Sequence, residues 1–163
     1  MTTALYPGSF DPITLGHLNI IRRASRIFDQ VVVLVMMNSE KKSMFTIDER
    51  LALVQRVTKR LPNVSVVTTD ELLAEHAKKY EGAVLVKGLR AVSDFDYELQ
   101  LALINKKMNA ELETVFLPAS EKYTFLSSTA TKEMARYGAD LSEFVPVEII
   151  DDVIEKTKYR RQT

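Results

Sequence analysis

The run from Tyr6 to His17 combines turn-forming residues with a threonine and a histidine at the start of an expected helix. Gly8 and Gly16 allow the backbone to approach a ligand or to adopt a positive φ. Thr14 is a candidate N-cap, since its hydroxyl can accept a hydrogen bond from the first helical turn. The remaining N–H groups and the helix dipole favour an anion, and His17 would lie beside it. The run predicts a phosphate site, although an ordinary strand-to-helix turn with a surface histidine could hold the same residues.

Strand and helix patterns alternate along the chain, which indicates an α/β fold. The apolar run 31–37 is typical of a parallel strand covered on both faces, and 46–49 forms a capping-box pattern that begins a helix. The expected strands are 4–6, 31–37, 64–67, 83–86 and 114–117. The expected helices follow the first strand with apolar positions between 20 and 28, and then cover 46–62, 70–80, 93–108, 127–137 and 147–158. We therefore predict a Rossmann-like open parallel five-stranded sheet with helices on both faces.

In such a sheet, ligands bind at the carboxyl ends of the strands, near the point where the strand order reverses. The loops that follow the expected strands contain Lys41 and Lys42, Lys87 and Arg90, and the hydroxyl-rich stretch 123–129. Each loop alone is compatible with ordinary solvated side chains. Their convergence on one edge of the sheet favours a shared phosphate site.

Composition restricts the protein class. The 163 residues include 22 Lys plus Arg and 22 Asp plus Glu, so the formal net charge is zero and general nucleic-acid binding is not expected. The chain has no cysteine, which excludes disulfides, a thiolate nucleophile and cysteine-ligated metals. The longest apolar run, 31–37, is far shorter than the ~20 residues of a membrane helix, and no leader pattern precedes it. We expect one domain over residues 1–163, soluble, unprocessed and cytoplasmic, with no membrane partner.

Two common nucleotide-binding patterns are absent from the sequence. It contains neither Gly-x-x-x-x-Gly-Lys-Ser/Thr nor Gly-x-Gly-x-x-Gly, which argues against a P-loop NTPase and a conventional dinucleotide dehydrogenase. A different nucleotide chemistry is indicated.

Three segments carry a resemblance to a known family. The run 8–17 resembles the Thr/His-x-Gly-His signature of the nucleotidyltransferase superfamily. The segments 87–98 and 125–129, with their spacing, resemble the bacterial phosphopantetheine adenylyltransferase family. The similarity covers nearly the whole chain, from about residue 4 to the final helix.

This resemblance implies transfer of the adenylyl group of ATP to 4′-phosphopantetheine, giving dephospho-coenzyme A and pyrophosphate, the penultimate step of coenzyme A synthesis. The attacking phosphate is already anionic at neutral pH, so no covalent intermediate and no strong base are needed. Positioning and charge stabilisation would carry the in-line displacement.

The resemblance also implies individual roles. His17 matches the histidine that stabilises the transition state at the α-phosphate, and Ser9 matches a residue that contacts both substrates. Lys41 matches the lysine that orients the attacking phosphate, and Leu73 matches an apolar contact with the pantetheine arm. Lys87 stands where the family usually has arginine, so its phosphate contact lacks the planar fork of arginine.

The ATP-site positions implied by the resemblance are Ser9, Phe10, His17, Gly88, Leu89, Arg90, Glu98, Tyr123, Thr124, Phe125, Leu126, Ser127, Ser128 and Thr129. Arg90 matches the arginine that contacts the ATP phosphates. Thr129 replaces a serine but keeps its hydroxyl. His76 has no expected role beyond structure or surface.

The resemblance further implies Mg²⁺ carried with ATP, binding of dephospho-coenzyme A and coenzyme A, and a homohexamer. No metal-ligand spacing is present in the sequence. The apolar positions 95, 99, 102 and 103 do not indicate an oligomer by themselves, because such a stripe usually belongs to the core.

Two alternatives remain open at this point. The first keeps the nucleotidyl chemistry and changes the acceptor to nicotinate mononucleotide, or makes a cytidylyl product. The second is a nonenzymatic nucleotide-binding module on the same fold.

Overall fold

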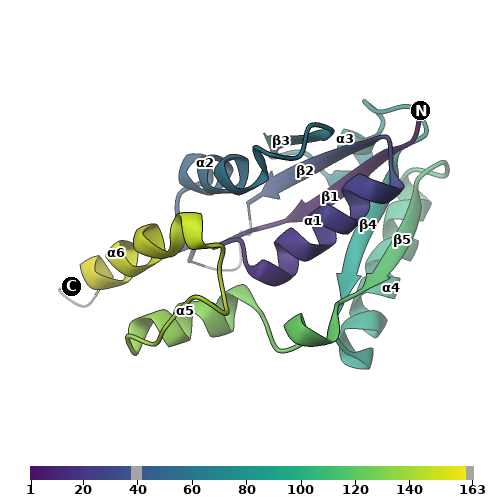
Figure 1. The fold of residues 1–163 in the computed structure, drawn as a ribbon. Coiled ribbons are helices and arrows are strands. Elements are labelled where there is room, and N and C mark those ends of the chain that lie inside the picture. The colour runs from purple at the N-terminus through teal and green to yellow at the C-terminus, as the bar shows by residue number, and fades with distance from the viewer. Residues whose placement is uncertain (38–41, 161–163) are drawn as a thin grey trace.

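Across residues 1–37 and 42–160, which the computed structural model describes, five parallel strands form one sheet in the order β3-β2-β1-β4-β5 (Figure 1). The strands are β1 Thr3–Gly8, β2 Gln30–Met36, β3 Val64–Thr69, β4 Val84–Leu89 and β5 Glu113–Pro118. Each adjacent pair is parallel, and the strand order reverses between β1 and β4. The predicted Rossmann-like open parallel sheet is confirmed.

Helices follow the strands as predicted, with small shifts of their ends. They are α1 Leu15–Ile27, α2 Ile47–Thr58, α3 Leu73–Ala77, α4 Val92–Met108, α5 Ser128–Arg136 and α6 Ile150–Arg160. Two short 3₁₀ helices are η1 Glu121–Tyr123 and η2 Val147–Ile149. The sequence pattern overestimated the length of α3, which was expected over 70–80. The segment before it is a bend in which the Glu71 N–H donates to the Thr69 hydroxyl.

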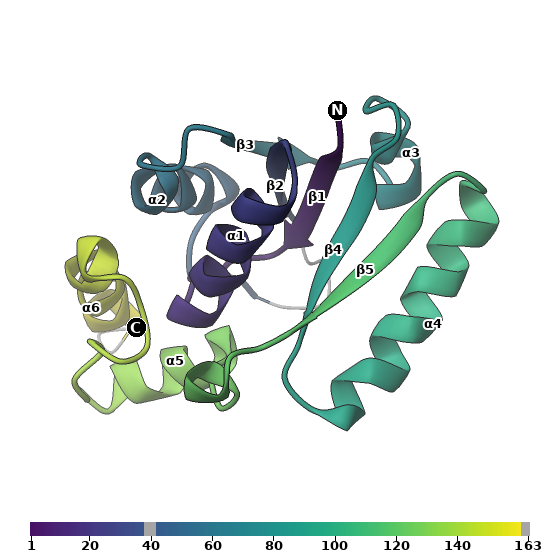
Figure 2. The ribbon, with the colours of Figure 1, turned by 45° about the vertical axis from the view of Figure 1, so that its right-hand side comes forward.

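The strands alternate their side chains between two apolar layers, as period-two geometry requires. Val31, Val33 and Val35 of β2 belong to the core beneath α1 and α2, whereas Val32 and Leu34 belong to a second core beneath α3. Figure 2 shows α1, α2, α5 and α6 on one side of the sheet and α3 and α4 on the other. Both faces of the central strands are thereby covered.

Local sequence signals account for several helix ends. Thr46 and Glu49 exchange hydrogen bonds in the capping box predicted for α2. Gly138 has a φ of 73° just after α5, a conformation that an L side chain adopts only with strain. These ends depend on neighbouring residues, which is why the sequence indicated them.

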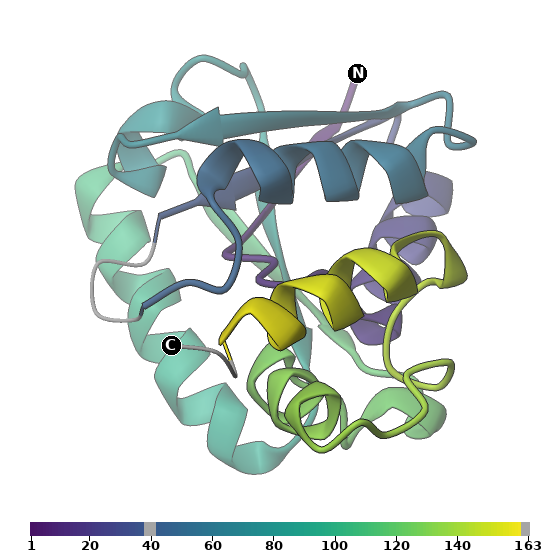
Figure 3. The same ribbon diagram turned by 90° about the vertical axis from the view of Figure 1, so that its left-hand side faces the viewer.

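The C-terminal helix α6 lies between α2 and α5 (Figure 3). Arg56 of α2 pairs with Asp152 of α6 at 2.7 Å, and Lys156 of α6 pairs with Glu49 at 2.5 Å. These ion pairs tie the last helix to the side of the molecule that also carries the capping box.

The apolar stripe of α4 is not core, contrary to the expectation for such a stripe. Phe95 and Leu99 are each 38% exposed, and Leu103 is 63% exposed, while Ala102 is half-buried. The physical reason is the position of the helix: α4 packs on β4 and β5 at the edge of the sheet, and no described element covers its outer side (Figure 2).

Candidate functional site

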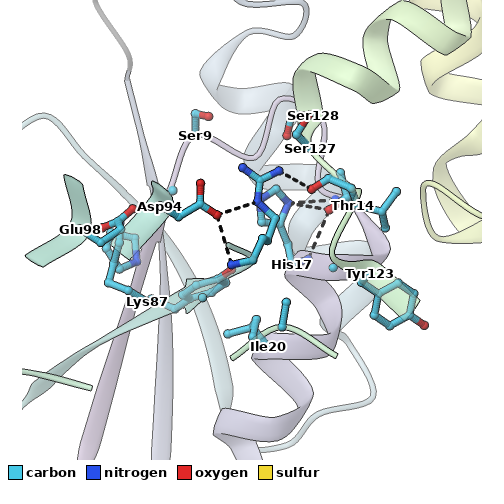
Figure 4. Close-up of a pocket in the computed structure, with 18 residues that line it drawn as sticks. Ser9, Thr14, His17, Ile20, Lys87, Asp94, Glu98, Tyr123, Ser127 and Ser128 are labelled. Atoms are coloured by element: carbon cyan, nitrogen blue, oxygen red, sulfur yellow. Dashed lines mark hydrogen bonds and ion pairs between the residues drawn. The ribbon is translucent and has the colours of Figure 1, made fainter. Parts of the chain in front are cut away.

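A cavity of about 290 Å³ opens at the carboxyl ends of β1 and β4, where the strand order reverses. This is the place where α/β sheets bind ligands. Ten of the predicted site residues line it: Ser9, His17, Lys87, Gly88, Arg90, Glu98, Tyr123, Leu126, Ser127 and Ser128. Figure 4 shows how those that it labels, from the loop after β1, from α1, β4 and α4, and from the segment 123–128, are gathered around the cavity.

His17 is fixed at the start of α1 by Thr14. The N–H of His17 donates to the Thr14 hydroxyl at 3.3 Å, and the Thr14 N–H donates to Nδ1 of His17 at 3.1 Å. The pair forms a capping box in which imidazole takes the place usually held by glutamate. Because Nδ1 accepts this backbone hydrogen bond, the proton of the neutral ring resides on Nε2.

The surroundings of His17 keep the ring neutral. Burial, together with the nearby Arg90 and Lys87, lowers the pKa of His17 from 6.5 to about 4. The Phe10 ring packs edge-on against the imidazole at 5.1 Å. At neutral pH the ring is therefore a hydrogen-bond donor through Nε2.

The turn that leads to His17 takes its positive φ at a residue for which the sequence did not predict it. Phe10, and neither Gly8 nor Gly16, has the positive φ, at 46°. A Cβ on Gly8 would lie 2.9 Å from the Phe10 ring. The glycine is needed because it leaves room for the ring that supports His17.

Two cations reach the cavity from the end of β4, and each faces a carboxylate of α4. Lys87 Nζ lies 3.1 Å from Glu98 Oε2, an ion pair whose angles are not those of a hydrogen bond. Arg90 lies 3.4 Å from Asp94 through Nε, and its Nη1 donates to the Leu126 carbonyl at 2.6 Å. The guanidinium therefore connects β4 to the segment before α5.

The start of α5 forms the opposite wall. The Ser127 hydroxyl caps this helix by accepting from the Ala130 N–H at 3.0 Å. The Ser128 hydroxyl donates to the Pro12 carbonyl at 2.8 Å. Two predicted serines thus line the cavity while their hydroxyls also hold the local structure, and the helix N-terminus adds a positive partial charge.

Other predicted residues lie outside the cavity lining. Phe10 is buried beneath it, Leu89 lies beside it at the end of β4, and Leu73 packs against the second core on the far face of the sheet. Thr124, Phe125 and Thr129 are exposed next to the lining residues, and the Phe125 ring packs against Phe144 at 5.9 Å.

Lys41 lies outside the described residues. His76 is buried and pairs with Glu71 at 3.0 Å, away from the cavity.

Sequence reasoning missed several lining residues, including Tyr6, Ile20, Asp94 and Ala119. Asp94 was detectable, since it stands four residues before Glu98 and therefore on the same helix face. Tyr6 gave no such signal, because a tyrosine in a strand usually belongs to the core. Burial and the charge of Glu98 raise the pKa of Tyr6, so its hydroxyl stays protonated.

The charges suit a phosphorylated ligand. Lys87, Arg90, the His17 donor and the N-termini of α1 and α5 all face the cavity. Within residues 1–37 and 42–160, no group of three or more histidine, aspartate or glutamate side chains could hold a metal ion. In the same part of the chain, no helix is long and apolar enough to cross a membrane.

The chain matches the cytidylyltransferase-like family over residues 5–134. A relative from Caldanaerobacter subterraneus subsp. tengcongensis, named phosphopantetheine adenylyltransferase, is 51% identical over 158 residues, covering 97% of this chain and 99% of the relative. One of the same name from Clostridium kluyveri is 51% identical over 156 residues, covering 96% and 95%. A third, from Clostridium botulinum strain Alaska E43, is 47% identical over 158 residues, covering 97% and 99%.

Two solved structures share the fold. A putative nicotinate-nucleotide adenylyltransferase from Vibrio parahaemolyticus has a TM-score of 0.71 at 22% identity, covering 98% of this chain and 95% of that one. A Plasmodium falciparum nicotinic acid mononucleotide adenylyltransferase has a TM-score of 0.69 at 15% identity, covering 98% and 97%. At these identities the likeness supports the fold alone.

Proposed function

The chain belongs to the phosphopantetheine adenylyltransferase family and is a nucleotidyltransferase, and we propose that it transfers the adenylyl group of ATP to 4′-phosphopantetheine. The products are dephospho-coenzyme A and pyrophosphate, in coenzyme A biosynthesis. Support comes from relatives that carry this name and align over nearly their whole length.

The observation that carries the mechanism is the hydrogen bond from the Thr14 N–H to Nδ1 of His17, at 3.1 Å. The proton of the neutral ring is therefore on Nε2, and His17 lines the cavity, so we assign this N–H as the donor to the substrate. In the proposed displacement, an oxygen of the acceptor phosphate forms a bond to the α-phosphorus as the bond to pyrophosphate breaks. His17 donates to the oxygen on which negative charge grows, and this requires neither a covalent intermediate nor a protein base.

The cations divide between the two substrates in this proposal. Lys87, at the side of Glu98, faces the acceptor phosphate, and Arg90, tied to the Leu126 carbonyl, faces the ATP phosphates. Ser9 directly follows β1 and lines the same cavity, and in this proposal it contacts both substrates. The roles of Lys41 and Leu73, and the ATP contacts from 123–129, stay predictions.

We propose that Mg²⁺ enters with ATP, since Mg²⁺ keeps several waters and uses few protein ligands. The donor set fits this arrangement, because Asp94 and Glu98, the two acidic residues on the cavity lining, each face a cation already. When bound, the ion would offset the charge of the nucleotide phosphates.

We also propose that the protein assembles as a homohexamer in the cytoplasm. Support for self-association comes from the exposed apolar side chains of α4, including Tyr97, Leu103 and Ile104, which are 50% exposed or more. A large exposed apolar patch marks a site of contact with another protein, and we propose that these side chains form one.

The direct test is pyrophosphate release by the purified protein with Mg²⁺ and ATP. Parallel reactions contain 4′-phosphopantetheine, nicotinate mononucleotide or glycerol 3-phosphate, and a further set replaces ATP with CTP. We expect release with ATP and 4′-phosphopantetheine together. If pyrophosphate is released only in the reaction with nicotinate mononucleotide, the acceptor is a different one, and if it is released only in the reactions with CTP, the nucleotide is a different one. No release in any reaction would favour a binding module.

A further inference from the structure

Three charged residues lie behind the cavity and do not line it. Asp11 follows β1, Arg50 belongs to α2 and Lys132 belongs to α5. Asp11 is 4% exposed and Arg50 is 2% exposed. Buried charges are retained only where partners satisfy them, so their contacts indicate what they hold together.

Arg50 bridges the ends of β1 and β2. Its Nη1 donates to the Ser9 carbonyl at 2.7 Å and to the Met36 carbonyl at 2.8 Å. The pairing between β1 and β2 ends at Gly8 and Val35, so Ser9 and Met36 stand one position further along. One nitrogen atom thus joins the two strands where the pairing between them stops.

Asp11 makes the reciprocal connection toward α2. Its carboxylate accepts from the Met44 N–H at 2.8 Å and from the Phe45 N–H at 2.8 Å. The segment before α2 is therefore hydrogen-bonded to the loop after β1 through Asp11, and α2 is hydrogen-bonded to the same loop through Arg50.

A third element joins at Asp11. Lys132 Nζ lies 3.1 Å from Asp11 Oδ2, and the Ser128 hydroxyl donates to the Pro12 carbonyl one turn earlier in α5. The loop that carries Ser9 is thereby fixed to α2 and to the helix whose N-terminus faces the cavity.

We propose that Asp11 and Arg50 are positioning residues for adenylyl transfer, which hold the Ser9 loop and the start of α5 in one arrangement without contacting substrate. The inference rests on the proposed function. The network is costly in stability, because the Nε of Arg50 is buried with no hydrogen-bond partner in the described part of the chain. Stability alone therefore does not explain why a charged side chain occupies this position. Fixed placement of phosphate-facing groups explains why a charged side chain is kept there, since a displacement near 1 Å can cost ~10²-fold in rate.

The test compares Arg50→Met, Arg50→Lys and Lys132→Met with Val54→Ala, a fully buried residue of the same helix whose apolar side chain takes no part in these hydrogen bonds. We expect Arg50→Met to lower kcat by ~10²-fold and Lys132→Met by ~10-fold, with the KM for ATP within about threefold of wild type. Arg50→Lys keeps a charged donor and should recover most of kcat. Val54→Ala should lose thermal stability and keep kcat in the folded protein.

Several results would overturn the inference: kcat within twofold of wild type in both Met variants, no recovery in Arg50→Lys, or an equal loss in Val54→Ala. If Arg50→Met does not fold, Lys132→Met decides, because the hydrogen bonds of Asp11 to the Met44 and Phe45 N–H groups, and that of the Ser128 hydroxyl to the Pro12 carbonyl, do not involve Lys132. The wild-type reaction separates the two proposals. If the wild type is active and the variants keep its kcat, only the positioning role is contradicted. If the wild type is inactive, both the proposed function and this inference are contradicted.

Discussion

Thr14 and His17 hold each other through a reciprocal pair of hydrogen bonds, in which the Thr14 N–H donates to Nδ1 of the imidazole at 3.1 Å. One side chain thereby closes the first turn of α1 and has its tautomer set by the backbone. The hydrogen bond that caps the start of α1 also places the proton of the neutral ring on Nε2, in a residue that lines the cavity.

Substitutions of His17 separate its role as a cap of α1 from its role as a hydrogen-bond donor. His17→Ala removes both the donor and the cap partner, whereas His17→Glu restores the common capping-box residue and removes the donor. We expect turnover to fall ~10²-fold or more in both variants, measured as pyrophosphate release. Only His17→Ala should also lose about 1 kcal/mol of unfolding free energy in urea. Near-normal turnover in either variant would show that the cations and helix N-termini suffice.

The depressed pKa of His17 makes stability depend on pH. Folding lowers the pKa from 6.5 to about 4, so between these values the unfolded chain binds a proton that the folded protein does not. This contribution to the free energy of unfolding is fully present above pH 6.5 and is lost as pH falls toward 4, by about 3 kcal/mol. Urea titrations of wild type and His17→Gln at several pH values should show the difference.

The same ring can be observed directly. The chain has two histidines, so nitrogen chemical shifts can be assigned by comparison with His17→Gln. We expect the proton on Nε2 at pH 7 and a midpoint near 4. A protonated Nδ1, or a midpoint near 6.5, would contradict the donor assignment.

Local signals explain how much of the fold was predictable. The Thr46–Glu49 capping box, Gly138 and the apolar run in β2 each act over a few residues, so the sequence indicated them correctly. The exposure of α4 was not predictable, since it depends on which strand lies at the sheet edge. The sequence pattern of Phe95 and Leu99 would be the same beneath another helix.

The site shows the same division. The phosphate-facing ends of β1 and β4 follow from topology, and the sequence placed Ser9, His17 and Arg90 there. The tautomer of His17 and the carbonyl partners of Arg50 depend on side-chain conformations and on contacts between distant segments. No spacing rule supplies these.

Lys87 offers a test of charge geometry at the acceptor side. Its Nζ lies 3.1 Å from Glu98, and an arginine could meet both this carboxylate and a phosphate with its planar fork. We expect Lys87→Arg to lower the KM for 4′-phosphopantetheine about fivefold and Lys87→Met to raise it at least tenfold. Lys79→Arg, at a surface pair with Glu71, is the matched control. Unchanged KM values in both Lys87 variants would remove this residue from the acceptor site.

Gly8 should tolerate no side chain. An added Cβ would lie 2.9 Å from the Phe10 ring, which packs on His17, so Gly8→Ala must displace that ring. We expect a loss of about 1–3 kcal/mol in unfolding free energy, with reduced turnover. Gly16→Ala meets neighbours at 3.5 Å or more and should keep its stability. Equal stability of the two variants in urea would contradict this account.

The outer side of α4 predicts self-association that reaches the site. Leu103 is 63% exposed, while Asp94 and Glu98 of the same helix line the cavity, so burying the outer side in an interface would also hold these carboxylates in place. We expect wild type to sediment as a hexamer and Leu103→Glu as a smaller, folded species with lower kcat/KM, because a buried charge without a partner disfavours assembly. Ile27→Glu introduces the same charge at a residue of α1 that is 59% exposed, and it should leave the assembly intact. A monomeric wild type at micromolar concentration, or dissociation by Ile27→Glu and not by Leu103→Glu, would place the contact elsewhere.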